Sequence, residues 1–110
     1  MAENKFGSDA LNVFDGKSFS YVYENDWAFT NVFEGATRIS VVEGRGTLRE
    51  HVEIRRVGPD AYFIAWIDDE MGALTQLVDL AAKTLLVSVP IEGKIEVWTG
   101  TITAFDDANA

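Results

Sequence analysis

Residues 18–29 read SFSYVYENDWAF, and this stretch decides the fold that the sequence predicts. Its aromatic residues recur mostly at alternate positions, on both sides of the polar triplet Glu-Asn-Asp: Phe19, Tyr21, Tyr23, Trp27 and Phe29. Successive side chains of a strand point to opposite faces, so the alternation predicts a strand whose two tyrosines share one face. The triplet predicts a tight hairpin turn with Asp26 in a place often taken by glycine, because aspartate tolerates left-handed dihedral angles better than most residues.

Short stretches of β-branched and aromatic residues alternate with turn signals along the rest of the chain. They predict strands at residues 18–23, 27–33, 37–42, 47–57, 61–67, 74–80, 84–89 and 94–105. The breaks between them are short, which implies antiparallel neighbours. We therefore expect an all-β fold, a small up-and-down barrel of the calycin or lipocalin type with about eight strands, because closure removes exposed sheet edges. Such an interior is filled by side chains or holds one small ligand.

One alternative to this all-β pattern is a helix at LTQLVDLAAKTLL, residues 74–86, where the apolar residues partly fit helical spacing. The letters AAKT after Asp79 also read as a turn between two strands. No repeat or linker interrupts the chain, so we expect one barrel domain over residues 14–105. The polar and small residues of 1–13 and 106–110 are expected to be flexible.

Composition excludes several classes of function. The 110 residues contain no cysteine and one histidine, so we expect no metal site, and we expect no cofactor. Lys and Arg number 9 against 18 Asp and Glu, and a net charge of −9 repels nucleic acid and anionic membranes. The N-terminus lacks the basic and apolar blocks of a signal peptide, and no apolar run is long enough to span a bilayer. We therefore expect a cytoplasmic protein.

Three ordered blocks between residues 14 and 80 carry a resemblance to known families. They are FDGKSFSYVYENDW at 14–27, GRG at 44–46 before a long strand, and YFIAWIDDEMG at 62–72. In this order they are similar to the bacterial phenolic acid decarboxylases and to the MoaF-like proteins, both small calycin-type β-barrels. The resemblance implies a homodimer and a barrel interior that holds a small aromatic acid.

The same resemblance implies which residues line that interior. The positions that match the catalytic residues of the decarboxylases are Tyr21, Tyr23, Arg45 and Asp68. The further side chains that we expect to contact a ligand are Phe19, Trp27, Tyr62, Ile64 and Trp66. Decarboxylation of a para-hydroxycinnamic acid needs no metal, because the phenol pushes electrons towards a protonated side-chain carbon and carbon dioxide then leaves. Arg45 would hold the carboxylate, and a tyrosine or a protonated Asp68 would handle protons.

The chain departs from the decarboxylase pattern at Asp68, which stands where those enzymes have glutamate. The substitution withdraws the carboxyl group by about 1.5 Å, and a displacement of about 1 Å already costs on the order of 100-fold in rate. Asp68 also reads simply as the first residue of an acidic turn, DDE. Three hypotheses therefore stand: a cofactor-free lyase, a non-catalytic MoaF-like binding module, and a structural or oligomer-forming domain with a solid barrel.

The orientation of Arg45 depends on the glycines beside it. Arg45 is in phase with Thr47 and Arg49, which we expect to face solvent, whereas Leu48 and Val52 belong to the apolar face. A bulge or bend at Gly44 and Gly46 would turn Arg45 inward.

Overall fold

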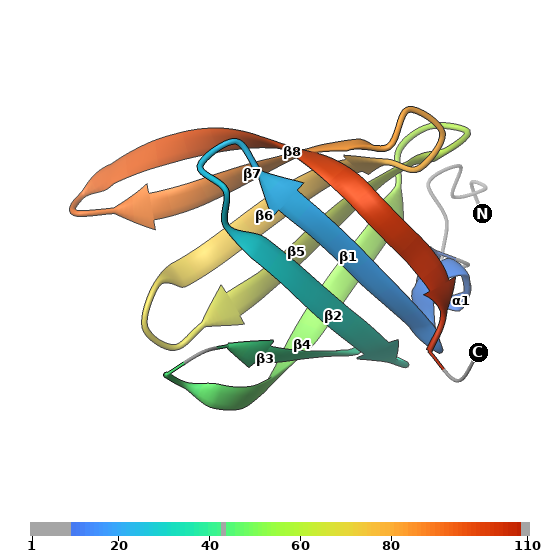
Figure 1. Ribbon diagram of the computed structural model, residues 1–110, viewed down its shortest axis with the longest axis horizontal. Helices are drawn as coiled ribbons and strands as arrows, with labels where there is room; N and C mark the ends of the chain where they lie inside the picture. The colour runs from blue at the N-terminus through green and yellow to red at the C-terminus, as the bar shows by residue number, and fades with distance from the viewer. Residues whose placement is uncertain (1–9, 43, 109–110) are drawn as a thin grey trace, which may run out of the picture.

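The computed structural model describes residues 10–42 and 44–108 and shows a closed barrel of eight antiparallel strands (Figure 1). Each strand pairs with its neighbour in sequence, and the last strand closes on the first. The elements are α1 (Ala10–Phe14), β1 (Lys17–Tyr23), β2 (Ala28–Glu34), β3 (Thr37–Val42), β4 (Gly46–Arg56), β5 (Ala61–Asp68), β6 (Gly72–Asp79), β7 (Thr84–Ile91) and β8 (Lys94–Asp107). The predicted all-β barrel is confirmed, and the observed strands follow the predicted ones closely.

The alternative of a helix at residues 74–86 is wrong. The segment forms β6 and β7, joined by a turn in which the Asp79 carboxylate accepts hydrogen bonds from the backbone N–H groups of Ala81 and Ala82 at 3.0 and 2.9 Å. Lys83 follows with a φ of 59°. This local hydrogen bonding satisfies the turn and lets the two apolar stretches pair as strands.

The hairpin predicted from SFSYVYENDWAF is present between β1 and β2. Asp26 has a φ of 70°, in the left-handed region, and its backbone N–H donates to the Tyr23 carbonyl at 2.9 Å. The Tyr23 N–H in turn donates to the Trp27 carbonyl at 2.9 Å. Aspartate thus supports the turn that the sequence predicts.

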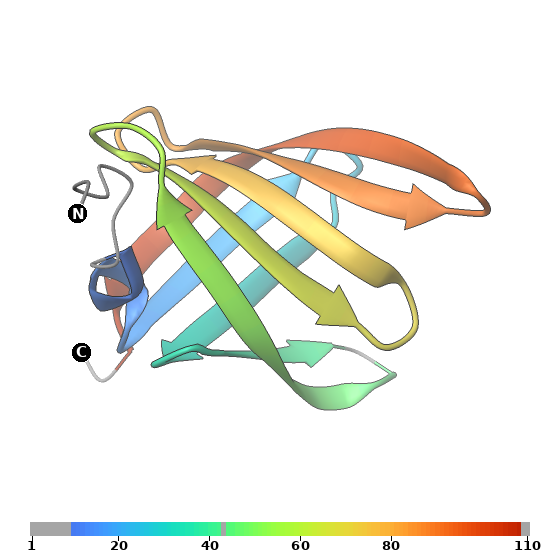
Figure 2. The same ribbon diagram turned by 180° about the vertical axis from the view of Figure 1, so that it is seen from behind.

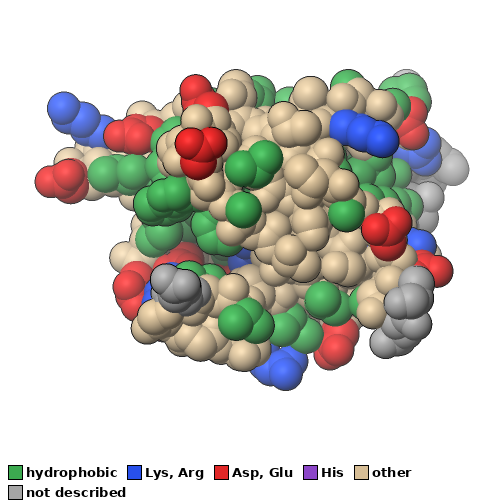
Figure 3. Space-filling view, viewed as in Figure 1, with side chains coloured by type: hydrophobic (Ala, Val, Ile, Leu, Met, Phe, Trp, Pro, Cys, Tyr) green, Lys and Arg blue, Asp and Glu red, His purple; other side chains and the backbone are tan. Residues whose placement is uncertain are grey.

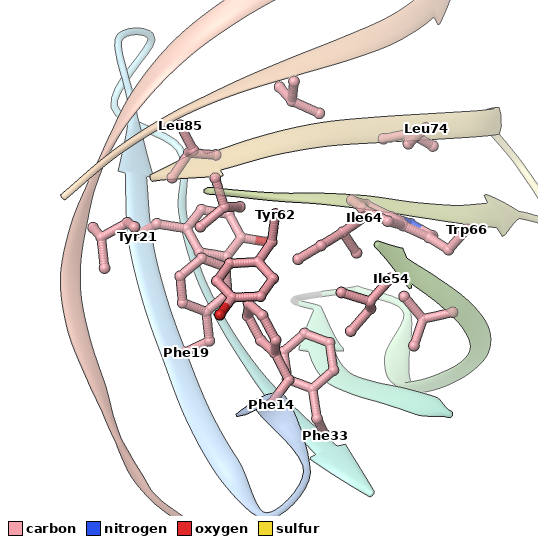
Figure 4. Packing of buried hydrophobic residues seen from close by; sticks show 14 of the residues in the cluster. Phe14, Phe19, Tyr21, Phe33, Ile54, Tyr62, Ile64, Trp66, Leu74 and Leu85 are labelled. Atoms are coloured by element: carbon pink, nitrogen blue, oxygen red, sulfur yellow. The ribbon is translucent and has the colours of Figure 1, made fainter. Parts of the chain in front are cut away.

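Helix α1 closes one end of the barrel, beside the start of β1 and the end of β8 (Figures 1 and 2). Its Phe14 is fully buried and packs edge to face against Phe33, Tyr62 and Phe105, with ring centroids 5.2, 5.2 and 5.3 Å away. Figure 4 shows the rings of Phe33 and Tyr62 close to Phe14. Most of this helix lies within residues 1–13, for which the sequence predicts no helix or strand. Residues 1–9 and 109–110 fall outside the described residues.

Strand β3 places the polar side chains of Arg38 and Ser40 inside the barrel and the apolar ones of Ile39 and Val41 outside. Its register with β4 pairs Arg38 with Glu50 and Ser40 with Leu48. Arg38 and Ser40 therefore lie on the same inner face of the sheet as Leu48. Val41 points outward and is 74% exposed. Figure 3 shows that uncharged atoms dominate the outer face formed by β1, β2 and β8, with charged side chains towards its edges. No helix in the described part of the chain is long and apolar enough to cross a membrane.

Candidate functional site

The barrel end opposite α1 contains a cavity of about 270 Å³. The β1–β2, β3–β4, β5–β6 and β7–β8 turns all lie towards this end (Figure 2). Its lining residues are Tyr21, Tyr23, Trp27, Phe29, Arg38, Ser40, Val42, Arg45, Leu48, Trp66, Asp68, Glu70, Met71, Leu74, Val87, Val89 and Trp98. Aromatic and aliphatic side chains therefore form most of the wall, and two guanidinium groups interrupt it.

The structure brings together most of the residues that the sequence selects. The predicted residues that line the cavity are Tyr21, Tyr23, Trp27, Arg45, Trp66 and Asp68. The other three, Phe19, Tyr62 and Ile64, are buried but do not line it. Phe19 and Tyr62 instead pack against Phe14 of α1, with ring centroids 6.1 and 5.2 Å from it (Figure 4). These three side chains belong to the solid part of the core.

Arg38 forms the polar floor of the cavity. Its Nη1 donates to Glu50 Oε1 at 2.5 Å, and its Nη2 donates to the Tyr21 hydroxyl at 3.3 Å. The guanidinium carbon lies 4.1 Å from the centroid of the Trp66 ring, which is a cation–π contact. The Tyr21 hydroxyl donates onward to Asn31 Oδ1 at 2.7 Å. Three groups therefore contact the Arg38 guanidinium: the Glu50 carboxylate, the Tyr21 hydroxyl and the Trp66 ring.

Burial and pairing shift the pKa values of Arg38 and Glu50 in opposite directions. Desolvation disfavours the charged form of Arg38, but Tyr21 and Glu50 outweigh it and raise the pKa of the guanidinium. Burial raises the pKa of Glu50, and the Arg38 charge only partly offsets that. Two buried nitrogens, Arg38 Nε and Asn31 Nδ2, have no hydrogen-bond partner among the described residues. Unpaired donors of this kind are uncommon in native interiors.

Tyr23 lies higher in the cavity wall, where Gln76 orients it. Gln76 Nε2 donates to the Tyr23 hydroxyl at 2.8 Å. Desolvation by burial and the neighbouring Tyr21 raise the pKa of Tyr23 well above its usual value. Tyr23 therefore remains a neutral phenol at every physiological pH. Because its oxygen already accepts from Gln76, its O–H is the group left to donate.

Arg45 reaches the cavity from a turn rather than from within a strand. Gly44 and Gly46 flank it with φ of 83° and 78°, values that favour glycine, and the Arg45 N–H donates to the Val42 carbonyl at 2.9 Å. The reversal removes Arg45 from the outward phase of β4 and turns it towards the mouth. The two glycines thus direct Arg45 inward, as the sequence predicts. They do so through a turn between β3 and β4 rather than through a bulge.

At the mouth Arg45 is surrounded by acidic side chains. Its guanidinium donates to both oxygens of Asp68 at 3.0 and 3.2 Å, to Asp69 at 2.8 Å, and lies 3.0 Å from Glu70 Oε2. The hydrogen bond to Asp68 is the largest cause of the raised pKa of Arg45, and the other carboxylates add to it. This cation is therefore already neutralised by its neighbours.

Asp68 holds the β5–β6 turn together. Its Oδ1 accepts from the backbone N–H groups of Glu70 and Met71 at 2.9 and 3.0 Å, in addition to Arg45. Desolvation would raise the pKa of Asp68, but these hydrogen bonds prevail and lower it. Asp68 is thus an ionised turn residue that also lines the cavity. That direction of shift is opposite to the one a proton donor needs.

The sequence gives a weak signal for the interior polar residues that the site prediction does not include, namely Asn31, Arg38, Ser40, Glu50 and Gln76. Glu50 stands in phase with Leu48 and Val52 on the apolar face of β4, and this alternation marks it as inward-facing. For Arg38 the signal misleads, because Ile39 and Val41 make the opposite face of β3 the more apolar one. Only its pairing with Glu50 across β3 and β4 places it inside.

The arrangement can bind a ligand through several kinds of contact. Aromatic faces, the Tyr23 hydroxyl and the Ser40 hydroxyl border the cavity, and Ser40 makes no side-chain hydrogen bond to another described residue. Within residues 10–42 and 44–108, no three His, Asp or Glu side chains come together in a way that could hold a metal ion.

Comparisons with known proteins address the fold. No protein-family model matches the chain, and no curated protein matches it. A similar solved structure is the crystal structure of a "putative beta-lactamase" from Burkholderia vietnamiensis, with a TM-score of 0.73 and 21% sequence identity. The match covers 83% of this chain and 94% of that chain. At this identity the likeness shows that the two chains share the barrel fold.

Proposed function

We propose that this barrel binds a small aromatic molecule in the cavity at its open end. The observation that carries the proposal is the lining: the rings of Tyr23, Trp27, Phe29, Trp66 and Trp98 surround a space of about 270 Å³ above a polar floor. Ligand pockets typically combine apolar and aromatic walls with a few convergent polar groups. A cavity of about 150 Å³ already accommodates benzene, so this one has room for a substituted ring.

The protein carries its own reporters for such a ligand. Its three tryptophans, Trp27, Trp66 and Trp98, all line the cavity. The indole N–H signals in an NMR spectrum of ¹⁵N-labelled protein should therefore shift when 2-phenylethanol is titrated in. We expect saturable shifts of all three signals and a smaller response to 2-cyclohexylethanol, which lacks the aromatic ring.

A matched pair of variants locates the binding. Val42 lines the cavity, whereas the adjacent Val41 points outward. We expect Val42→Phe to fill the cavity and weaken binding of 2-phenylethanol at least tenfold, and Val41→Phe to leave binding unchanged. Absence of any saturable shift at millimolar probe, or equal loss in both variants, would overturn the proposal.

A cofactor-free carboxy-lyase is a second candidate, and Tyr23 is the observation that favours it. The phenol stays protonated at the cavity wall, where the hydrogen bond from Gln76 positions its oxygen, and burial makes it a weaker acid than a free tyrosine. The acid role would rest on Tyr23 and not on Asp68, whose pKa is lowered. Incubation with p-coumaric, ferulic and caffeic acids should then release vinylphenols, and Tyr23→Phe should abolish the release. No turnover in the unmodified protein would remove this candidate.

Homodimerisation through the outer face of β5, β6 and β7 is proposed on different grounds. Phe63, Leu77 and Leu86 are cross-strand neighbours there and are 41%, 43% and 40% exposed. A face of three strands about 24 Å long and about 5 Å per strand covers about 360 Å², so such a dimer would be at the small end of specific interfaces. A second copy presents the same apolar side chains, so the two proteins, each of net charge −9, would meet there without direct contact between like charges.

Light scattering after size-exclusion chromatography tests the dimer. We expect a dimer that Leu77→Lys converts to a monomer, while Val41→Lys on another outer face leaves it intact. A monomeric unmodified protein at micromolar concentration would contradict the proposal.

A further inference from the structure

Four aromatic side chains form a ring of contacts at the mouth of the cavity, here called the aromatic rim: Tyr23, Trp27, Phe29 and Trp98. Each ring packs against the next at a steep angle, and the chain of contacts closes on itself. The centroid distances are 5.6 Å for Tyr23–Trp98, 5.5 Å for Trp98–Trp27, 6.5 Å for Trp27–Phe29 and 5.8 Å for Phe29–Tyr23. All four rings line the cavity, and Trp27 is 53% exposed. A ligand that enters the cavity lies against this rim.

Acidic groups surround the aromatic rim. Glu96 Oε1 accepts a hydrogen bond from Trp98 Nε1 at 2.9 Å, and Glu70 lines the same cavity. Glu24, which follows Tyr23, accepts from the backbone N–H of Thr99 at 2.8 Å, next to Trp98. Three of the four aromatic residues are thus adjacent in sequence or hydrogen-bonded to a carboxylate: Tyr23 precedes Glu24, Trp27 follows Asp26, and Trp98 donates to Glu96.

The two cations of the site do not offset this acidity. Arg38 is paired with Glu50, and Arg45 is shared among Asp68, Asp69 and Glu70. An anionic ligand would therefore have to displace a carboxylate from one of the arginines and would meet an excess of negative charge at the mouth. A cationic ligand would instead be attracted by the negative charge at the mouth.

Aromatic rings attract cations through the negative potential of their faces. The barrel already uses this interaction, since the Arg38 guanidinium carbon lies 4.1 Å from the centroid of the Trp66 ring. The aromatic rim offers the same chemistry at a place that a ligand can reach, with Glu96 hydrogen-bonded to Trp98 and Glu70 in the lining of the same cavity to complement the charge. Leu74, Val87 and Val89 line the same cavity with apolar surface, which suits an uncharged ring.

We infer that the natural ligand is a small arylalkyl amine whose protonated nitrogen sits at the aromatic rim and whose aromatic ring fills the cavity below. This inference rests on the proposed binding function and adds the charge of the ligand to it. It differs from the aromatic acid that the sequence resemblance implies.

Three probes of matched size separate the alternatives: 2-phenylethylamine, which is cationic at neutral pH, 2-phenylethanol, which is neutral, and phenylacetate, which is anionic. Calorimetry or NMR titration of the full chain at pH 7 gives the three Kd values. We expect the amine to bind about tenfold more tightly than the alcohol, and the anion most weakly. Raising the salt concentration from 50 to 500 mM should weaken the amine several-fold and leave the alcohol unchanged.

Charge-only substitutions at the rim refine the test. Glu96→Gln and Glu70→Gln retain the side-chain shape, and together they should weaken the amine at least fivefold with less than twofold effect on the alcohol. Glu53→Gln, on the outer face of β4, is the matched control and should change neither affinity. Because the alcohol reports an intact cavity, a folding defect cannot imitate the expected result.

The outcomes distinguish this inference from the proposed function. Binding of the alcohol with no preference for the amine overturns the inference alone. Tightest binding of phenylacetate also overturns it and favours a carboxylate held by Arg45. Failure of all three probes overturns both the inference and the proposed binding function.

Discussion

Arg38 and Glu50 face each other across β3 and β4 inside the barrel, directly opposite in register and joined through Nη1 and Oε1 at 2.5 Å. Their side chains are only 7% and 9% exposed. Taking two charges out of water is costly, and the cost is recovered only when both are paired and hydrogen-bonded. Tyr21 and the Trp66 ring supply the additional contacts that stabilise Arg38.

This pairing predicts a strong dependence of each charge on the other. Glu50→Leu leaves Arg38 buried without its carboxylate and should lower the free energy of unfolding by about 3–5 kcal/mol. The double variant Arg38→Met with Glu50→Leu removes both charges and should recover most of that loss. Urea unfolding followed by tryptophan fluorescence measures both values. A double variant as unstable as Glu50→Leu would show that the charge itself is not what destabilises the single variant.

Asp68 predicts a specific loss of stability in acid. Its folded-state pKa is lowered, so the stability that it contributes is present above its unfolded pKa of about 3.9 and is lost as the pH falls through the folded value. At pH 7, Asp68→Asn should cost about 1 kcal/mol, because Arg45 and the turn amides lose a charged acceptor at a solvent-screened mouth. The difference between the variant and the unmodified protein should shrink as the pH falls below about 3.9. Urea unfolding from pH 7 to 2.5 tests this, and a constant difference would contradict it.

Phe14 is the larger of the two buried side chains by which helix α1 closes its end of the barrel. Phe14 is fully buried against Phe33, Tyr62 and Phe105, so Phe14→Ala should lower the free energy of unfolding by about 3–5 kcal/mol through lost contacts and a residual cavity. Asn12→Ala, on the exposed side of the same helix, is the control and should change it by less than about 0.5 kcal/mol. If the two substitutions cost the same, the helix does not close the barrel as described.

The β6–β7 turn holds a lysine in an unfavourable conformation. Lys83 has a φ of 59°, which costs a residue with a Cβ atom about 1 kcal/mol relative to glycine. Lys83→Gly should therefore raise the melting temperature, by about 2–5 °C if most of that strain is released. Ala82→Gly, one residue earlier, should lower it, because glycine there only adds entropy to the unfolded chain. Differential scanning calorimetry of the two variants decides the sign.

Short-range features of the sequence are sufficient to predict the strands and the turns between them. Period-two alternation, the acceptor side chain of Asp79 and the tolerance of Asp26 for positive φ act over a few residues, and each appears in the structure as the sequence predicts. Part of the cavity lining was predictable for the same reason: Tyr21 and Tyr23 lie two residues apart on one strand, as do Trp66 and Asp68. Arg45 required only the two glycines beside it.

The tertiary structure decided which residues lie opposite one another on neighbouring strands. Barrel closure and register, not hydropathy, place Arg38 inside while Val41 lies outside, because Arg38 finds its partner Glu50 on the neighbouring strand. The aromatic rim likewise joins Tyr23 of β1 to Trp98 of β8, which come together only when the first and last strands pair. Sequence alone thus determined the strands, the turns and the barrel class. The charge environment of the cavity follows from contacts between residues far apart in the chain, which no local pattern encodes.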